Sequence, residues 1–172
     1  GGEGVTVVFG RFGETIRALV EAVERHPALT WISSRHEGSA SLMAAALAKL
    51  TGELQVCLAP SGPGALHVLA GLLDAQRDRV PVLAVTGDEQ QEQLEGLGGL
   101  QDADQSMIFR QCFPSTTISS AARANMNIRR SAKAAQARSA VSHLSIVPGI
   151  QSSELQPDTR KDSADLSDQA SF

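Results

Sequence analysis

The sequence predicts an α/β fold in which helices cover both faces of a doubly wound, mainly parallel sheet. Short apolar runs alternate with segments of helical periodicity, and this alternation is typical of parallel strands joined by right-handed crossovers. The run Val82–Thr86 is almost wholly apolar, as expected for a strand covered by helices on both sides. Aromatic residues make up only 3% of the chain, so we expect an aliphatic core.

Six segments of the chain are expected to be strands: Val5–Phe9, Thr30–Ser33, Leu54–Leu58, Val82–Thr86, Thr116–Ser119 and Leu144–Val147. Helices are expected where apolar residues recur at three- and four-residue spacing, namely after Gly13, around 40–47, around 65–72, over 103–113 and over 121–141. We expect residues 1–150 to form one domain. Residues 151–172 are rich in Ser, Asp and Gln, and they predict a polar, mobile tail.

Charge and composition disfavour several kinds of partner and location. The net charge of −4 argues against a nucleic-acid partner. No apolar stretch reaches membrane-spanning length and the start does not resemble a signal peptide, so we expect no membrane span and a cytoplasmic location. Cys57 and Cys112 show no pairing or metal-ligand spacing. The basic residues between 114 and 150 predict a solvated helix face rather than a binding patch.

Three strand-to-helix segments are candidates for a ligand site, because ligands of open parallel sheets bind outside the carboxyl ends of the strands. They are Gly10–Gly13, Ser34–Glu37 and Pro60–Gly64. Neither the Gly-x-Gly-x-x-Gly dinucleotide motif nor the Gly-Lys-Ser/Thr ending of a P-loop is present in the first of them. Taken alone, Glu37 is most simply a helix-start carboxylate attracted by the helix dipole, and His67 falls off the apolar stripe of its helix and is expected at the surface.

Several motifs taken together, in one order, change that interpretation of Glu37. They are Arg35-His36-Glu37, an Ala-rich helix, Ser61-Gly62-Pro63-Gly64-Ala65, Gly71-Leu72-Leu73-Asp74-Ala75 and the stretch from Val80 to Gly87. The series resembles the N-terminal pyrimidine-binding domain of thiamine-diphosphate enzymes of the pyruvate oxidase and acetohydroxyacid synthase group. The likeness extends over about residues 5 to 150.

The resemblance implies a six-stranded parallel sheet and a catalytic role for Glu37. In that family this carboxyl hydrogen-bonds a ring nitrogen of the cofactor's aminopyrimidine and favours the tautomer that removes the proton from C2 of the thiazolium. A 2-oxo acid such as pyruvate is then decarboxylated. The resemblance also implies that the aminopyrimidine pocket is lined by Gly10, Phe12, Gly13, Ser61, Gly62, Pro63 and Gly64.

The chain lacks some motifs and residues of the family pattern, and these differences limit what the chain is expected to do alone. The family holds the cofactor's diphosphate through magnesium on a Gly-Asp-Gly motif of a separate domain, and no Gly-Asp-Gly occurs in this sequence. We therefore expect no metal ligands of its own, a diphosphate-binding domain or subunit as partner, and a homo-oligomer. Phe12, Ala70 and Asp88 stand where the family usually has Pro, Asn and Gln. Gln101 is a weak candidate for contact with the substrate.

Three hypotheses follow from these observations. The first is part of a thiamine-diphosphate enzyme, active only when paired with a diphosphate domain. The second is a catalytically inactive binding or assembly module, or a truncated fragment, that keeps only the fold. The third is an unrelated nucleotide-binding α/β domain, which the missing glycine and lysine motifs disfavour.

Overall fold

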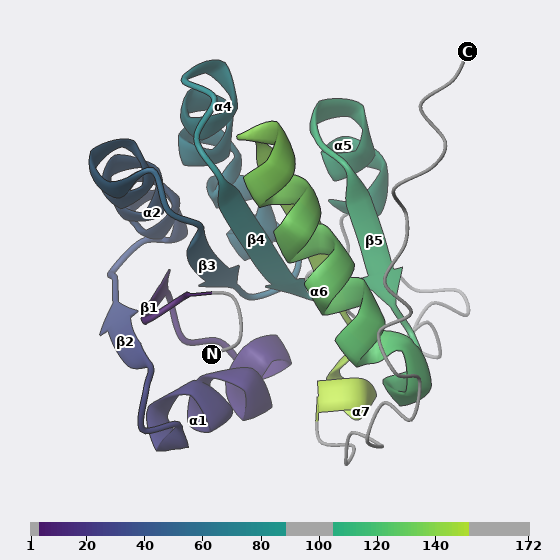
Figure 1. Cartoon of the computed structure of the whole chain (residues 1–172). Coiled ribbons are helices and arrows are strands. Elements are labelled where there is room, and N and C mark those ends of the chain that lie inside the picture. The colour runs from purple at the N-terminus through teal and green to yellow at the C-terminus, as the bar shows by residue number, and fades with distance from the viewer. Residues whose placement is uncertain (1–3, 89–104, 152–172) are drawn as a thin grey trace.

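The computed structural model describes residues 4–88 and 105–151 and contains a single six-stranded parallel sheet (Figure 1). Its strand order is β2-β1-β3-β4-β6-β5, and every neighbouring pair is parallel. The prediction of a doubly wound parallel sheet is therefore confirmed. The strands are β1 (Val7–Gly10), β2 (Thr30–Ser33), β3 (Gln55–Ala59), β4 (Val82–Gly87), β5 (Ser115–Ile118) and β6 (Val141–Ile146).

Helices cover both faces of this sheet. They are α1 (Arg17–Arg25, after the 3-10 turn η1, Glu14–Ile16), α2 (Glu37–Thr51), α3 (Pro63–His67), α4 (Leu69–Arg77), α5 (Gln105–Cys112), α6 (Ala121–Arg138) and α7 (Pro148–Gln151). The buried apolar residues form two clusters, one beneath α2, α4 and α5 and the other beneath α1 and α6. Val8 and Phe9 belong to different clusters, as expected for successive residues of a strand. Within the described ranges, none of the helices has the length and apolar character needed to cross a bilayer.

The predicted boundaries are wrong at several places. The helix expected over 121–141 ends at Arg138, because Ser139 adopts a left-handed conformation (φ 47°) that stops it. The last strand consequently begins at Val141 rather than Leu144. The helix expected around 65–72 is two helices that meet at Val68. The polar tail lies outside the described residues, except for Gln151 at the end of α7.

Small residues let α2 pack directly against the segment α3–α4. Four alanines of α2 are fully buried, and Gly71 of α4 faces Ser41 and Leu42. A Cβ at Gly71 would lie 2.4 Å from Ser41 Oγ and 2.5 Å from the backbone nitrogen of Leu42. At the start of α2, a Cβ on Gly38 would lie 3.1 Å from the carbonyl oxygen of His67. The backbones of the two elements therefore approach closely at both positions, which fixes the start of α2 beside the end of α3.

An open apolar groove of about 530 Å³ lies on the other face of the sheet, between α1 and α6. Val8, Leu58 and Leu83 form part of its floor, and Leu19 and Ile128 part of its walls. None of the predicted site residues lines this groove. The candidate site must therefore be sought at the carboxyl ends of the strands.

We expect Gly71→Val to destabilise the domain by about 1–3 kcal/mol, because the added side chain must separate α2 from α4. Urea unfolding monitored by circular dichroism measures the loss. Ala70→Val is the matched control, since Ala70 is the preceding residue of α4 and is exposed. It should cost no more than about 0.7 kcal/mol, the helix-propensity difference. Equal unfolding midpoints for the two variants would show that the helices are not packed this closely.

Candidate functional site

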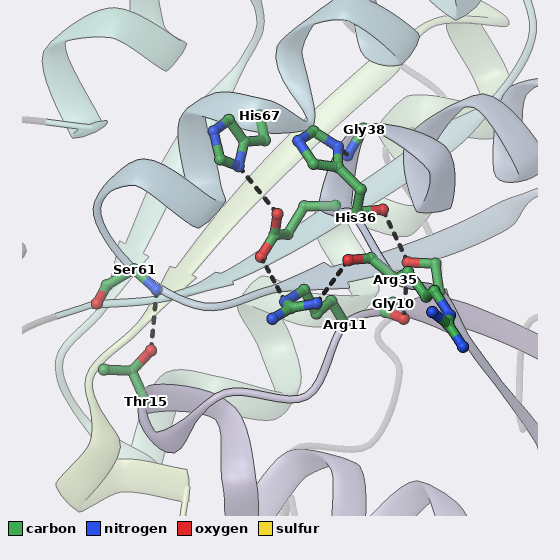
Figure 2. Close-up of polar contacts among 10 residues, drawn as sticks. Gly10, Arg11, Thr15, Arg35, His36, Gly38, Ser61 and His67 are labelled. Atoms are coloured by element: carbon green, nitrogen blue, oxygen red, sulfur yellow. Dashed lines mark hydrogen bonds and ion pairs between the residues drawn. The ribbon is translucent and has the colours of Figure 1, made fainter.

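The candidate site lies where the strand order reverses. In the sheet, β1 lies between β2 and β3. The connection from β1 runs outward to the edge strand β2, and the connection from β2 crosses back over β1 to β3. The loops after these strands diverge at such a point and leave a crevice for ligands. All three predicted segments meet here. The backbone N–H of Ser61 donates to Thr15 Oγ1 at 2.9 Å, which ties the loop after β3 to η1 (Figure 2).

Glu37 is the first residue of α2, and its carboxylate is held between two cationic or hydrogen-bonding partners. The side chain is only 8% exposed. His67 Nδ1 lies 2.9 Å from Oε2, and Arg11 Nε lies 3.3 Å from Oε1. Figure 2 shows His67 and Arg11 on opposite sides of the group. Each oxygen of the carboxylate therefore has its own partner, Arg11 from the loop after β1 and His67 from the end of α3.

The loop before Glu37 is fixed by hydrogen bonds to the loop after β1. Ser34 Oγ lies 3.1 Å from the Gly10 carbonyl oxygen and 2.8 Å from that of His36, and its single hydrogen can donate to either. An Arg11 guanidinium nitrogen donates to the Arg35 carbonyl at 2.5 Å. His36 caps the helix, because its Nδ1 accepts from the Gly38 N–H at 3.0 Å. These bonds orient the start of α2 and thereby aim Glu37 into the crevice.

The two histidines lie side by side. The rings of His36 and His67 are stacked, with centroids 4.5 Å apart and planes 30° apart. In the described ranges they form, with Glu37, the one group of three or more His, Cys, Asp or Glu side chains placed to hold a metal ion. Two of the three ligand atoms in this group are imidazole nitrogens, whereas magnesium requires oxygen ligands.

The carboxyl of Glu37 has a pKa below its usual value. Burial acts to raise this pKa, but the opposing effects are together larger: hydrogen bonds from His67 and from the backbone N–H of Glu37, and the positive charges of His67 and Arg11. Hydrogen bonds and positive charges favour the ionised form of a carboxyl. The site of the isolated chain therefore holds a carboxylate that is buried and ionised at neutral pH.

The predicted pocket glycines lie around this carboxylate or support the loop beside it. Gly64 is next to it, because a Cβ there would lie 3.4 Å from Glu37 Oε1. Gly13 and Gly64 both pack on Pro60, and Gly10 packs on Trp31 so closely that a side chain would clash. Gly62 caps α3 with a positive φ of 64°.

The remaining predicted residues differ in their placement. Ser61 is buried, whereas Pro63 is exposed at the start of α3. Phe12 is 52% exposed, so in this chain its ring does not pack into the domain. Asp88 accepts a hydrogen bond from Ser145 Oγ at 2.7 Å. Gln101 lies outside the described residues.

Neither partner of Glu37 is predicted from the sequence. The sequence patterns do not single out Arg11, and they place His67 at the surface because it falls off the apolar stripe of its helix. The predicted surface position of His67 is confirmed, since its side chain is 46% exposed, yet its Nδ1 is bonded to Glu37 Oε2. A buried carboxylate needs a nearby cation. That requirement points to the basic residues of the three segments, which include Arg11 but not His67.

Comparison with known proteins assigns the chain to a family. The model of the thiamine pyrophosphate enzyme N-terminal TPP-binding domain matches residues 2–108. The chain belongs to this family. Domains of this kind occur in relatives that are pyruvate oxidases and acetolactate synthases, so the resemblance found in the sequence is confirmed.

Three relatives illustrate the likeness. The chain is 41% identical over 85 residues to a pyruvate oxidase of Lactiplantibacillus plantarum, covering 49% of this chain and 14% of that enzyme. It is 39% identical over 105 residues to an acetolactate synthase of Mycobacterium avium, covering 61% and 17%. It is 40% identical over 85 residues to the large subunit of acetolactate synthase isozyme 2 of Escherichia coli, covering 49% and 15%. The matched segment is thus a small part of much longer proteins.

We expect Glu37 to stabilise the fold in a pH-dependent way. Its folded-state pKa is lowered, so its contribution is present above the unfolded value of about 4.3 and is lost as the pH falls through the folded value. The stability difference between wild type and Glu37→Gln should therefore be largest near pH 7 and should shrink as the pH falls below about 4.3. Urea unfolding at a series of pH values measures it.

The matched control is Glu24→Gln, which removes an exposed carboxylate of α1. Its stability difference from wild type should stay nearly flat over the same pH range. Comparing differences between variants cancels the titration of groups that do not contact Glu37, such as the buried His143. A difference for Glu37→Gln that does not change with pH would contradict the lowered pKa.

Proposed function

We propose that this chain supplies the aminopyrimidine side of a thiamine-diphosphate site, with Glu37 as the carboxyl that hydrogen-bonds a pyrimidine ring nitrogen. The supporting observation is a buried carboxylate at the point where the strand order reverses, in a domain of the TPP-binding family. Glu37 would pass a proton to and from the ring nitrogen, which requires a carboxyl in a pocket sheltered from water. When bound, the cofactor itself supplies the carbanion chemistry.

The residues around Glu37 fit the pyrimidine part of such a cofactor. Gly64 lets the backbone of its turn pack against Pro60 beside Glu37, since a Cβ there would lie 2.6 Å from Pro60 Cγ. A carboxylate oxygen has more than one acceptor site, so a ring N–H can reach Glu37 without displacing both existing partners. The loops carrying Gly13 and Gly64 are braced on Pro60. The pocket wall is therefore shaped before any ligand arrives.

The diphosphate part of the cofactor does not fit the described residues. The one metal-capable cluster there contains two imidazoles and a single carboxylate, whereas magnesium favours oxygen ligands in octahedral geometry. We therefore propose that magnesium and the diphosphate are held by another domain or subunit. The substrate proposed for the complete enzyme is a 2-oxo acid of the pyruvate type, and the complete enzyme is proposed to be a cytoplasmic homo-oligomer.

An inactive binding or assembly module is the second candidate function. The exposed Phe12 favours it, because a large flexible ring stands at the pocket edge where the family resemblance implies a rigid proline. The two candidates differ in one respect that can be measured. Only the enzyme requires that Glu37 exchange a proton with a bound pyrimidine.

We expect the isolated chain to bind 4-amino-5-hydroxymethyl-2-methylpyrimidine weakly at the Glu37 pocket. Titration followed by amide NMR should shift the signals of Gly38 and Gly64, and Glu37→Gln should abolish those shifts. Thiamine diphosphate should bind no more tightly with magnesium than without it, because the metal ligands are elsewhere. Tight magnesium-dependent binding by the chain alone would contradict the need for a second domain, and unchanged shifts in Glu37→Gln would contradict the pocket.

In the complete enzyme, Glu37→Gln should abolish 2-oxo-acid turnover while the far-ultraviolet circular dichroism spectrum stays unchanged. The amide keeps the shape of the side chain but cannot donate and recover a proton in the same way. Glu24→Gln again serves as the control and should retain full activity. Wild-type turnover by the Glu37 variant would eliminate the proposed catalytic role and leave the assembly module as the better account.

A further inference from the structure

We infer that His36, Glu37 and His67 form a binding site for a divalent transition metal of the Zn²⁺ class when no ligand occupies the pocket. Each residue offers one ligand atom, and these atoms all lie within 4.8 Å of one another. Two imidazoles and one carboxylate, with a fourth position left open to water, are a ligand set that zinc takes in proteins. The inference needs only this chain and does not depend on the proposed cofactor role.

The distances within the cluster need only small adjustments to accept the ion. Ligand atoms of a tetrahedral zinc ion lie about 3.4 Å apart, given bond lengths near 2.1 Å. His67 Nδ1 and Glu37 Oε2 are already 2.9 Å apart, so a cation can enter between them with a slight opening. Both histidines are exposed at the rim, so an ion can reach them from solvent.

Existing hydrogen bonds determine which ligand atoms remain available. His36 Nδ1 is occupied by the Gly38 N–H, which leaves Nε2 of that ring for the metal. Arg11 occupies Oε1 of Glu37, so Oε2, which is bonded to His67 Nδ1 in the metal-free chain, is the carboxylate ligand. The ionised state of Glu37 favours the site, because a metal ligand must be deprotonated. The guanidinium of Arg11 opposes a second positive charge, so we expect a moderate affinity.

The chemistry of the donors selects the metal. Imidazole nitrogen suits Zn²⁺, Co²⁺, Ni²⁺ and Cu²⁺, whereas Mg²⁺ and Ca²⁺ prefer oxygen ligands alone. The site therefore differs in kind from the magnesium site proposed for the other domain. A metal on Oε2 also takes the place of the hydrogen bond between Glu37 and His67.

The test is calorimetric titration of the metal-free chain with Zn²⁺, in a Cys112→Ser background because Cys112 is an exposed free thiol. We expect one ion per chain and no heat of binding with Mg²⁺. His67→Gln, His36→Asn and Glu37→Gln should each weaken Zn²⁺ binding by about tenfold or more. Asn is chosen at position 36 because it keeps a helix-capping side chain while removing the imidazole. Titration with Co²⁺ should give the stronger visible absorption of a four-coordinate ion.

The composition of the chain provides a matched control. It has four histidines and two cysteines, and of these His143 and Cys57 are buried. His26 is thus the only other exposed imidazole, and His26→Gln should bind Zn²⁺ as tightly as the parent. The inference is overturned if the parent binds no stoichiometric Zn²⁺, if Mg²⁺ binds equally well, or if the His36 and His67 variants bind Zn²⁺ like the parent. Circular dichroism confirms that each variant is folded.

Discussion

The arrangement of this domain at its carboxyl-terminal edge depends on one buried negative charge. Moving an ionised carboxylate out of water costs several kcal/mol unless partners compensate for it. Glu37 is 8% exposed and is compensated by His67, by Arg11 and by its own position at the start of a helix. Arg11 lies in the loop after β1, Glu37 begins α2 after β2, and His67 ends α3 after β3, so the charge joins the segments that follow these three strands. A neutral residue at this position would leave Arg11 without its ion pair and would loosen the connection between the loops.

The close packing of the helices makes that connection possible. His67 reaches Glu37 because α2 lies against α3 and α4 at backbone distance, and the missing side chains of Gly38 and Gly71 permit this approach. The buried alanines of α2 extend the contact along the helix. A larger residue at Gly71 would move α2 as a whole, and the carboxylate would move with it. Stability of the core and geometry of the site are thus consequences of the same small residues.

The architecture could be predicted from local patterns, but the site could be predicted only in part. The central strands could be located from their apolar runs, because a strand buried on both faces must be apolar. The edge strands β2 and β5 carry no such run and are largely exposed. The ends of helices were predicted less accurately. Ser139 ends α6 by adopting a left-handed conformation, which the serine side chain does not favour. Glu37 was found through the ordered motifs. Arg11 and His67 were missed because their roles depend on contacts across 26 and 30 residues of sequence, which spacing along a helix or strand does not reveal.

The ionisation of Glu37 links the proposed cofactor role to the rest of the enzyme. A carboxyl that shares a proton with a weakly basic ring nitrogen works best when its pKa approaches that of the ring, yet in this chain the pKa is lowered. Burial is the largest single influence on that pKa and acts to raise it, while His67 and Arg11 act against it. A second domain that closed over the pocket would remove more water and strengthen the effect of burial. A pyrimidine that displaced His67 from Oε2 would weaken the opposing effect. Both changes move the pKa upward, so on this proposal the partner domain does more than hold the diphosphate: it also brings Glu37 to the protonation state that the reaction needs.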